Sequence, residues 1–263
     1  MSARTSASPQ VIGALARFDG RKLATSGWVL VGLGIAALGT AAFVSVVFTD
    51  ASATWEDDVW TAHVGFMLLA VFTMVAVNWA ALRDHREHTT EQYESLPADK
   101  ATRIVAMLGA AALLALGSTL LLGAVAWFAS TQLDVPALTI VHVLHNGALV
   151  LMLSSLGLAL AAWIPNPFLA PVAAFAFYLI HPGESVATWH AIWPMATLLS
   201  AGLAIWHIAY LVGLTLMLAA LAQARWRARA SQAIALLAGS AIVAVALTVI
   251  ISRVCPTAGS CLL

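Results

Sequence analysis

IVAMLGAAALLALGSTLLLGAVAWF, residues 104–128, is a continuous stretch without a single charged side chain. An α-helix needs about 20 apolar residues to cross the hydrocarbon core of a membrane, so this stretch is expected to be a membrane-spanning helix. The rest of the chain has the same character, since 62% of its 263 residues are hydrophobic and 9% are charged. Soluble domains carry roughly 25% charged residues. The sequence therefore predicts an all-α, polytopic transmembrane helix bundle.

Six segments of the chain are long and apolar enough to cross the membrane. They cover residues 27–48, 60–82, 104–128, 136–163, 200–222 and 232–252. A seventh candidate, 166–180, is shorter and contains Pro167 and Pro171. Because proline removes a backbone donor, this segment is expected to be tilted, broken or partly re-entrant.

The Lys and Arg residues indicate how the spans are oriented. They gather before the first span, between the second and third, and between the last two. Cytoplasmic loops carry an excess of Lys and Arg, and seven crossings place all three clusters in the cytoplasm. We therefore expect about seven spans, with the N-terminus cytoplasmic and the C-terminus external. The expected parts are a cytoplasmic segment 1–26, a transmembrane domain 27–252 and an external tail 253–263.

The two ends of the chain lead to two further expectations. Residues 9–20 have apolar side chains at helical spacing, which indicates either an amphipathic helix on the inner membrane surface or a disordered tail. The first apolar run is too long for a signal peptide and is expected to be retained. Cys255 and Cys261 lie in the external tail, where a disulfide is favoured, so they are the candidate disulfide.

The loop 83–103, between the second and third spans, is strongly polar. Thr90 can cap a short helix that carries Glu91 and Glu94 and ends at Pro97. Judged by its residues alone, the segment fits an ordinary solvated cytoplasmic loop.

Four segments, taken together, resemble the permeases of ABC transporters. They are FDGRKL at 18–23, the pattern E-x-x-x-x-L-P-x-x-x-x-x-R at 91–103, WIPNP at 163–167 and WHIAYLVGL at 206–214. The chain is most similar to the small type-2-like permeases of high-GC (actinobacterial) bacteria. Many type-2 permeases have six spans, so a seventh span would be a departure from the family.

The resemblance implies a permease subunit, and we expect it to export its substrate. In that family the loop after the second span is the coupling element that sits in a groove of the ATP-binding subunit. This implies a partner interface at Glu91, Glu94, Leu96, Pro97 and Arg103. It also implies a second copy or a related permease as partner, and a location in the bacterial plasma membrane.

The cofactor expectations follow from what the sequence does and does not contain. The sequence has no G-x-x-x-x-G-K-[ST] loop, which is the usual phosphate-binding loop of ATPases. We therefore expect ATP and Mg to bind only to the partner chain. In this chain we expect neither a cofactor nor enzymatic activity. The formal net charge is +0, which gives no argument for nucleic acid binding.

Four histidines, His63, His142, His145 and His207, fall inside predicted spans. Ionisable groups inside a membrane are costly and are functional candidates. His142 and His145 are three residues apart and share a helix face. Together with His207 they are candidates to line a translocation path or to form interhelical hydrogen bonds. All four are weaker candidates for metal or haem ligation.

Two alternatives to a permease follow from these features. The first is a His-ligated haem or metal membrane protein, either an oxidoreductase or an assembly factor. The second is a membrane partner protein that transports nothing.

Overall fold

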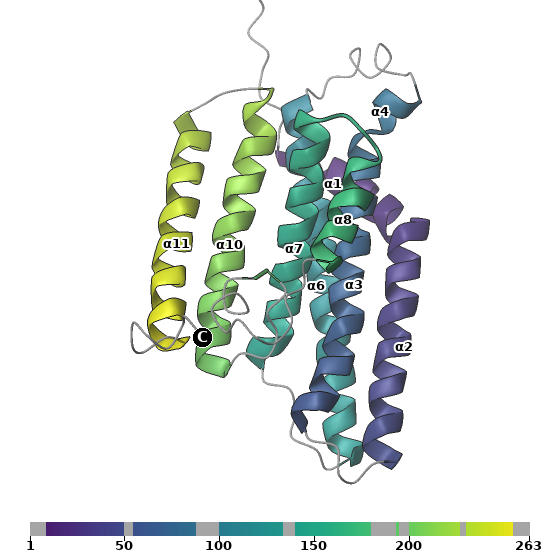
Figure 1. The fold of residues 1–263 in the computed structure, drawn as a ribbon. Coiled ribbons are helices and arrows are strands. Elements are labelled where there is room, and N and C mark those ends of the chain that lie inside the picture. The colour runs from purple at the N-terminus through teal and green to yellow at the C-terminus, as the bar shows by residue number, and fades with distance from the viewer. Residues whose placement is uncertain are drawn as a thin grey trace, which may run out of the picture.

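The computed structural model describes residues 9–49, 55–87, 100–133, 140–179, 193–194, 200–226 and 230–254. Within these residues all regular structure is helical, and the long helices stand side by side as a bundle (Figure 1). The prediction of an all-α fold is confirmed. The helices are α1 (Pro9–Ala24), α2 (Gly27–Thr49), α3 (Trp55–Ala81), α4 (Arg83–Arg86), α6 (Lys100–Leu133), α7 (Ile140–Trp163), α8 (Leu169–Leu179), α10 (Ala201–Ala224) and α11 (Ala230–Val254).

Several of these helices have the length and composition of membrane spans. In the described part of the chain, 4 helices qualify alone, namely α6, α7, α10 and α11, and α1 with the first part of α2 forms a bent pair that makes up to 5. The chain is therefore consistent with a multi-pass membrane protein.

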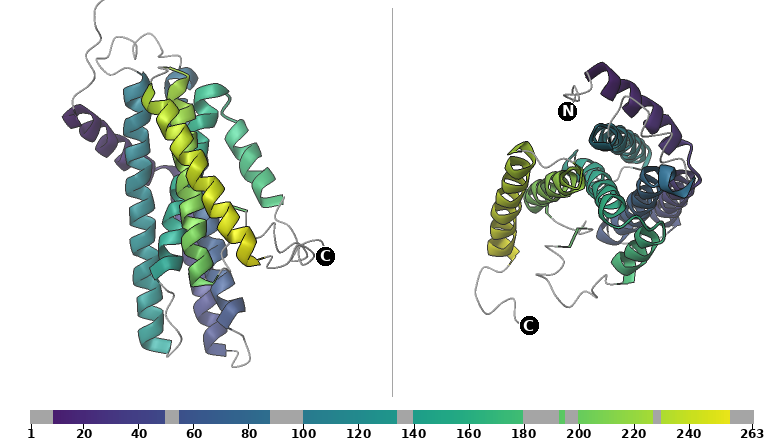
Figure 2. Two further views of the ribbon diagram at one scale, coloured as in Figure 1. Left: turned by 90° about the vertical axis from the view of Figure 1, so that its left-hand side faces the viewer. Right: turned by 90° about the horizontal axis from the view of Figure 1, so that it is seen from above.

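Helix α7 is the centre of the bundle. It contacts α3, α6 and α10, and the view from above shows it between them (Figure 2). Leu149 and Leu153 on α7 are 0% exposed. Its two buried serines donate to carbonyls of their own helix, Ser154 to Val150 at 2.7 Å and Ser155 to Leu151 at 2.9 Å. Both serine hydroxyls are therefore buried with a partner for their donor.

Glycines allow the helices around α7 to approach closely. A Cβ atom at Gly157 would overlap the carbonyl oxygen of Met74 on α3, and the amide of Asn78 donates to the Gly157 carbonyl at 3.0 Å. A Cβ at Gly32 would lie 3.0 Å from the Phe72 Cβ. Small residues are the usual means of close helix packing in membranes, where apolar surface gains nothing by leaving lipid.

Residues 9–20, for which a helix and a disordered tail were both open, belong to helix α1. This helix is bent by 59° from the first part of α2 and packs along α6 (Figure 2). A Cβ at Gly109 would lie 3.2 Å from the Ala16 Cβ, and one at Gly20 would lie 3.8 Å from the Ala110 Cβ. The small residues on both helices therefore hold α1 against the bundle.

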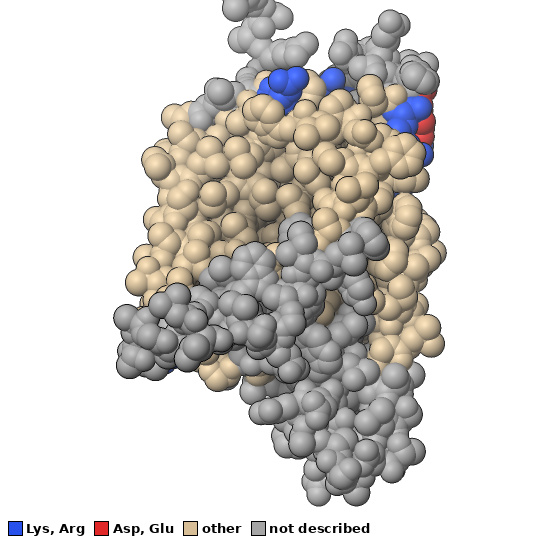
Figure 3. Space-filling model, viewed as in Figure 1, with Lys and Arg blue, Asp and Glu red and all other residues tan. Residues whose placement is uncertain are grey.

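One end of the bundle carries most of the described Lys and Arg residues. Figure 3 shows this end at the top, above a surface without described charges on the face in view. We call it the basic end and define it by Arg83, Arg86, Lys100, Arg103 and Arg225. Arg253, near the end of α11, lies at the opposite end, because α11 runs away from the basic end (Figure 1).

Tryptophans pair with these cations. Arg86 lies over the ring of Trp79 at 4.4 Å, and Lys100 over the ring of Trp226 at 4.5 Å. Trp79 also donates to the Pro167 carbonyl at 2.9 Å, which joins α3 to the turn before α8. Amphipathic rings beside cations are typical of a membrane–water interface.

The seventh candidate span contains helix α8, which has 11 residues. Such a helix is about 16 Å long and is shorter than the hydrocarbon core of about 30 Å. The expectation of a short or broken segment agrees with this length. Farther along the chain, Trp193 is 9% exposed and belongs to the core cluster that includes Leu211 of α10.

Candidate functional site

His145 on α7 and His207 on α10 meet inside the bundle. Their side chains bond through His145 Nε2 and His207 Nδ1 at 2.6 Å, and the ring centroids are 4.9 Å apart. The two residues are 2% and 0% exposed. Both residues were predicted as candidates for interhelical hydrogen bonds, but the sequence did not indicate that they bond to each other, since they are far apart in the chain.

The Trp193 carbonyl fixes where the protons lie. His207 Nε2 is 2.8 Å from this oxygen, which can only accept, so Nε2 carries a proton. In neutral His207, Nδ1 is then an acceptor, and His145 must donate from Nε2. Hydrogen bonds therefore run in one direction, from His145 to His207 to the Trp193 carbonyl. A proton added to His207 would reverse the first of them, because both nitrogens of an imidazolium are donors.

The other two candidate histidines, His142 and His63, lie on α7 and α3. His142 is half-buried one turn earlier on α7, where its carbonyl accepts a long 3.4 Å bond from Asn146. His63 lies on α3, and its side chain is outside the described residues. Among the described residues, no group of three or more His, Cys, Asp or Glu side chains could hold a metal ion.

The His145–His207 contact is itself unlike a metal site. Two ligand nitrogens on a tetrahedral zinc, each at about 2.0–2.1 Å, would be about 3.3 Å apart. The observed 2.6 Å separation is that of a strong hydrogen bond. The two hydrogen bonds join α7, α10 and residue 193.

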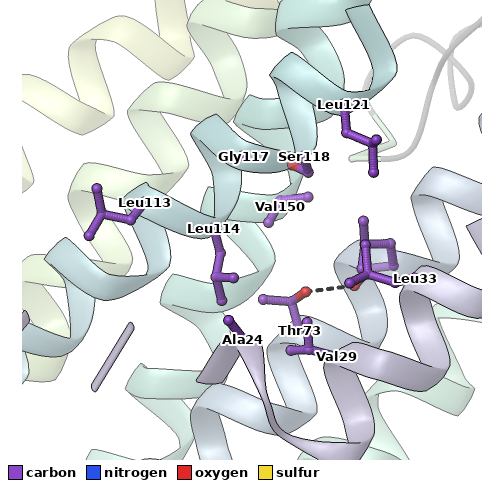
Figure 4. A pocket seen from close by; sticks show the side chains of 11 residues that line it. Ala24, Val29, Leu33, Thr73, Leu113, Leu114, Gly117, Ser118, Leu121 and Val150 are labelled. Carbon is purple, nitrogen blue, oxygen red and sulfur yellow. Dashed lines mark hydrogen bonds between the residues drawn. The ribbon is translucent and has the colours of Figure 1, made fainter. Parts of the chain in front are cut away.

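An apolar cavity of about 240 Å³ lies between α2, α3, α6 and α7 (Figure 4). Its two hydroxyl groups are already bonded within their own helices, Thr73 to Leu69 and Ser118 to Ala115, each at 2.8 Å. Leu33, Leu114 and Val150 supply part of the wall. The cavity therefore presents mainly hydrocarbon to an occupant.

A second and larger cavity, of about 410 Å³, opens at the basic end. Its walls come from α1, α3, α4, α6, α7 and the turn after α10. Asp19 of α1 lines it, and burial raises the pKa of this carboxyl, while Lys22, Arg103 and Arg83 oppose the rise. Sequence analysis missed Asp19 because a single acid in a basic entry segment has no distinctive pattern.

Of the residues predicted to form the partner interface, the structure describes Arg103. Glu91, Glu94, Leu96 and Pro97 lie outside the described residues, as do Cys255 and Cys261. Arg103 is in the first turn of α6 and lines the cavity at the basic end.

Comparison of the chain with protein-family models, with curated proteins and with solved structures returned no match. The resemblance to ABC permeases therefore rests on the four quoted segments. One of them, WIPNP, forms the turn between α7 and α8, where the Asn166 side chain accepts from the Phe168 backbone N–H at 2.9 Å.

Proposed function

We propose that the chain is the membrane-spanning permease subunit of an ABC transporter of the bacterial plasma membrane. It acts as an exporter, with a second copy or a related permease and with ATP-binding subunits that hold ATP and Mg. The four family-like segments supply the reason for this class of protein. The multi-pass helical bundle and its single basic end agree with it.

The arrangement of the helices supports seven crossings. Helix α1 lies toward the basic end and α11 finishes at the other end (Figure 1), as an odd number of crossings requires. The excess of Lys and Arg argues that the basic end faces the cytoplasm. In this scheme the segment 166–180, which contains α8, makes the fifth crossing, and the tail after α11 is external.

The observation that carries the proposal is the position of the two described helix ends that flank segment 88–99. Helix α4 precedes this segment and α6 follows it, and the ends of both helices that flank it lie at the basic end (Figure 1). Arg83 of α4 and Arg103 of α6 both act electrostatically on Asp19 of α1. The helix ends that flank segment 88–99 are thus linked to α1 at the end where an ATP-binding subunit would dock.

Helix α6 would carry movement from this segment into the membrane. It has 34 residues, so it is about 51 Å long and exceeds the hydrocarbon thickness. It packs against α1 and α7. A force on its first turn would move one continuous rod against the central helix, which is the kind of rigid-body shift that couples a site to a bundle.

Reversing the charge of both Glu91 and Glu94 to Lys tests the proposed interface. We expect permease-dependent ATP hydrolysis by the co-purified complex to fall on the order of tenfold, because both contacts with the partner become repulsive. The unfolding temperature of the permease should not change. Glu87→Lys is the control, since Glu87 forms an exposed ion pair with Arg83 at 2.9 Å, and such pairs contribute about 0–1 kcal/mol. Full coupling in the double variant would refute the interface.

A further inference from the structure

The cavity at the basic end combines an apolar wall with a cationic rim. Leu15 of α1, Ile104 and Met107 of α6 and Leu158 of α7 form part of the wall. At about 410 Å³ it falls within the usual range of roughly 300–1,000 Å³ for small-ligand sites. An occupant with an apolar part and a polar part would match both surfaces.

The rim has an excess of positive charge. Arg83, Lys100, Arg103 and Arg225 line the cavity, the acid among its lining residues is Asp19, and Arg83 pairs with Glu87 at 2.9 Å. The rise in the pKa of Asp19 on burial favours its neutral form and weakens its repulsion of an anion. The excess charge therefore favours an anionic head.

Aromatic rings hold two of these cations in place while leaving them charged. Lys100 lies over the Trp226 ring at 4.5 Å, and Arg225 lies 5.7 Å from the Trp163 ring and 6.0 Å from that of Trp226. A neutral ring orients a cation without cancelling its charge. Lys100 of α6 and Arg225 of the turn after α10 thus share one tryptophan at the edge of the cavity.

We propose that this cavity binds an anionic phospholipid of the surrounding bilayer, with its phosphate at the cationic rim and the upper part of an acyl chain against the apolar wall. Basic pockets between helices at the cytoplasmic side of membranes suit anionic headgroups. The bound lipid contacts α1, α6 and α7 together. It fixes α1 to the bundle beside the helix ends that flank segment 88–99.

Lipid titration of the purified full-length protein tests this proposal. Dioleoyl-phosphatidylglycerol in mild detergent is expected to bind and to raise the unfolding temperature, whereas the zwitterionic phosphatidylcholine is not. Lys100→Gln combined with Arg225→Gln should weaken phosphatidylglycerol binding at least about tenfold, since each cation near an anionic lipid contributes about 1 kcal/mol. Arg253→Gln removes a cation at the opposite end of the bundle and should leave binding unchanged.

Two further variants keep the test decisive if the double variant folds poorly. Ala162→Leu fills the cavity and keeps every charge, so it should weaken binding as well. Asp19→Asn removes the acid without adding bulk and should strengthen binding about threefold, as expected for losing one weak repulsion. Wild-type affinity in both variants would overturn the proposal. Equal binding of phosphatidylcholine, or of glycerol phosphate without chains, would overturn it too, since these would show a site that ignores lipid charge or lipid chains.

Discussion

Gly157→Leu is expected to prevent the bundle from folding. The Met74 carbonyl of α3 occupies the place where a side chain at residue 157 would begin, and the Asn78 amide bonds to the Gly157 carbonyl at 3.0 Å. Backbone cannot yield as a flexible side chain can, so α3 and α7 would have to separate. Overpacking of a core typically costs 1–3 kcal/mol and occasionally more, and we expect at least about 3 kcal/mol here. The yield of monodisperse protein after detergent extraction, followed by size exclusion, measures the effect.

A matched substitution at another glycine shows whether a larger side chain alone lowers the yield. Gly34 on α2 is exposed, and a Cβ there meets nothing within 4 Å. Gly34→Leu should therefore leave yield and unfolding temperature close to those of the wild type. Normal yield of Gly157→Leu would mean that α3 and α7 are not packed as closely as described.

His207→Leu is expected to destabilise the bundle by about 2–4 kcal/mol. It removes the acceptor for His145 and the donor to the Trp193 carbonyl, and both groups are buried. Each unmatched buried polar group costs about 1–3 kcal/mol. Chemical unfolding in detergent, followed by tryptophan fluorescence, measures the loss.

The nature of the replacement distinguishes a lost hydrogen-bond network from a packing defect. His207→Gln keeps a donor and an acceptor and should recover part of the stability, whereas His207→Leu keeps only bulk. Thr215→Ala is the control on the same helix, because Thr215 donates only to the Leu211 carbonyl of its own helix, at 2.8 Å. Equal stability of His207→Leu and the wild type would contradict the buried network.

Hydropathy predicted the long helices well because length and apolarity are the physical requirements for crossing a bilayer. The segment 104–128 lies within α6, and 27–48 within α2. The boundary errors have a simple cause. Helix α6 begins at Lys100, since a helix can continue beyond the apolar core through residues whose charged ends reach the interface. Hydropathy detects only the part in the hydrocarbon.

The candidate site was predicted less completely because it depends on contacts between distant residues. His145 and His207 could be named from their position inside spans, but their hydrogen bond depends on how α7 and α10 face each other. The bond from His207 to the Trp193 carbonyl was not predicted, because a backbone carbonyl that accepts from a buried histidine has no sequence pattern. The cavity at the basic end was missed for the same reason, since five or more separate elements contribute to it.

The most direct test of the permease proposal is affinity purification of the chain from native membranes, followed by quantitative mass spectrometry. Cross-linking before extraction retains a labile complex. We predict an ATP-binding subunit in stoichiometric amount. We also predict its loss when residues 88–99 are replaced by a Gly-Ser linker of equal length, with Arg253→Gln as an unaffected control. Recovery of the chain without an ATP-binding subunit, even after cross-linking, would contradict the proposal.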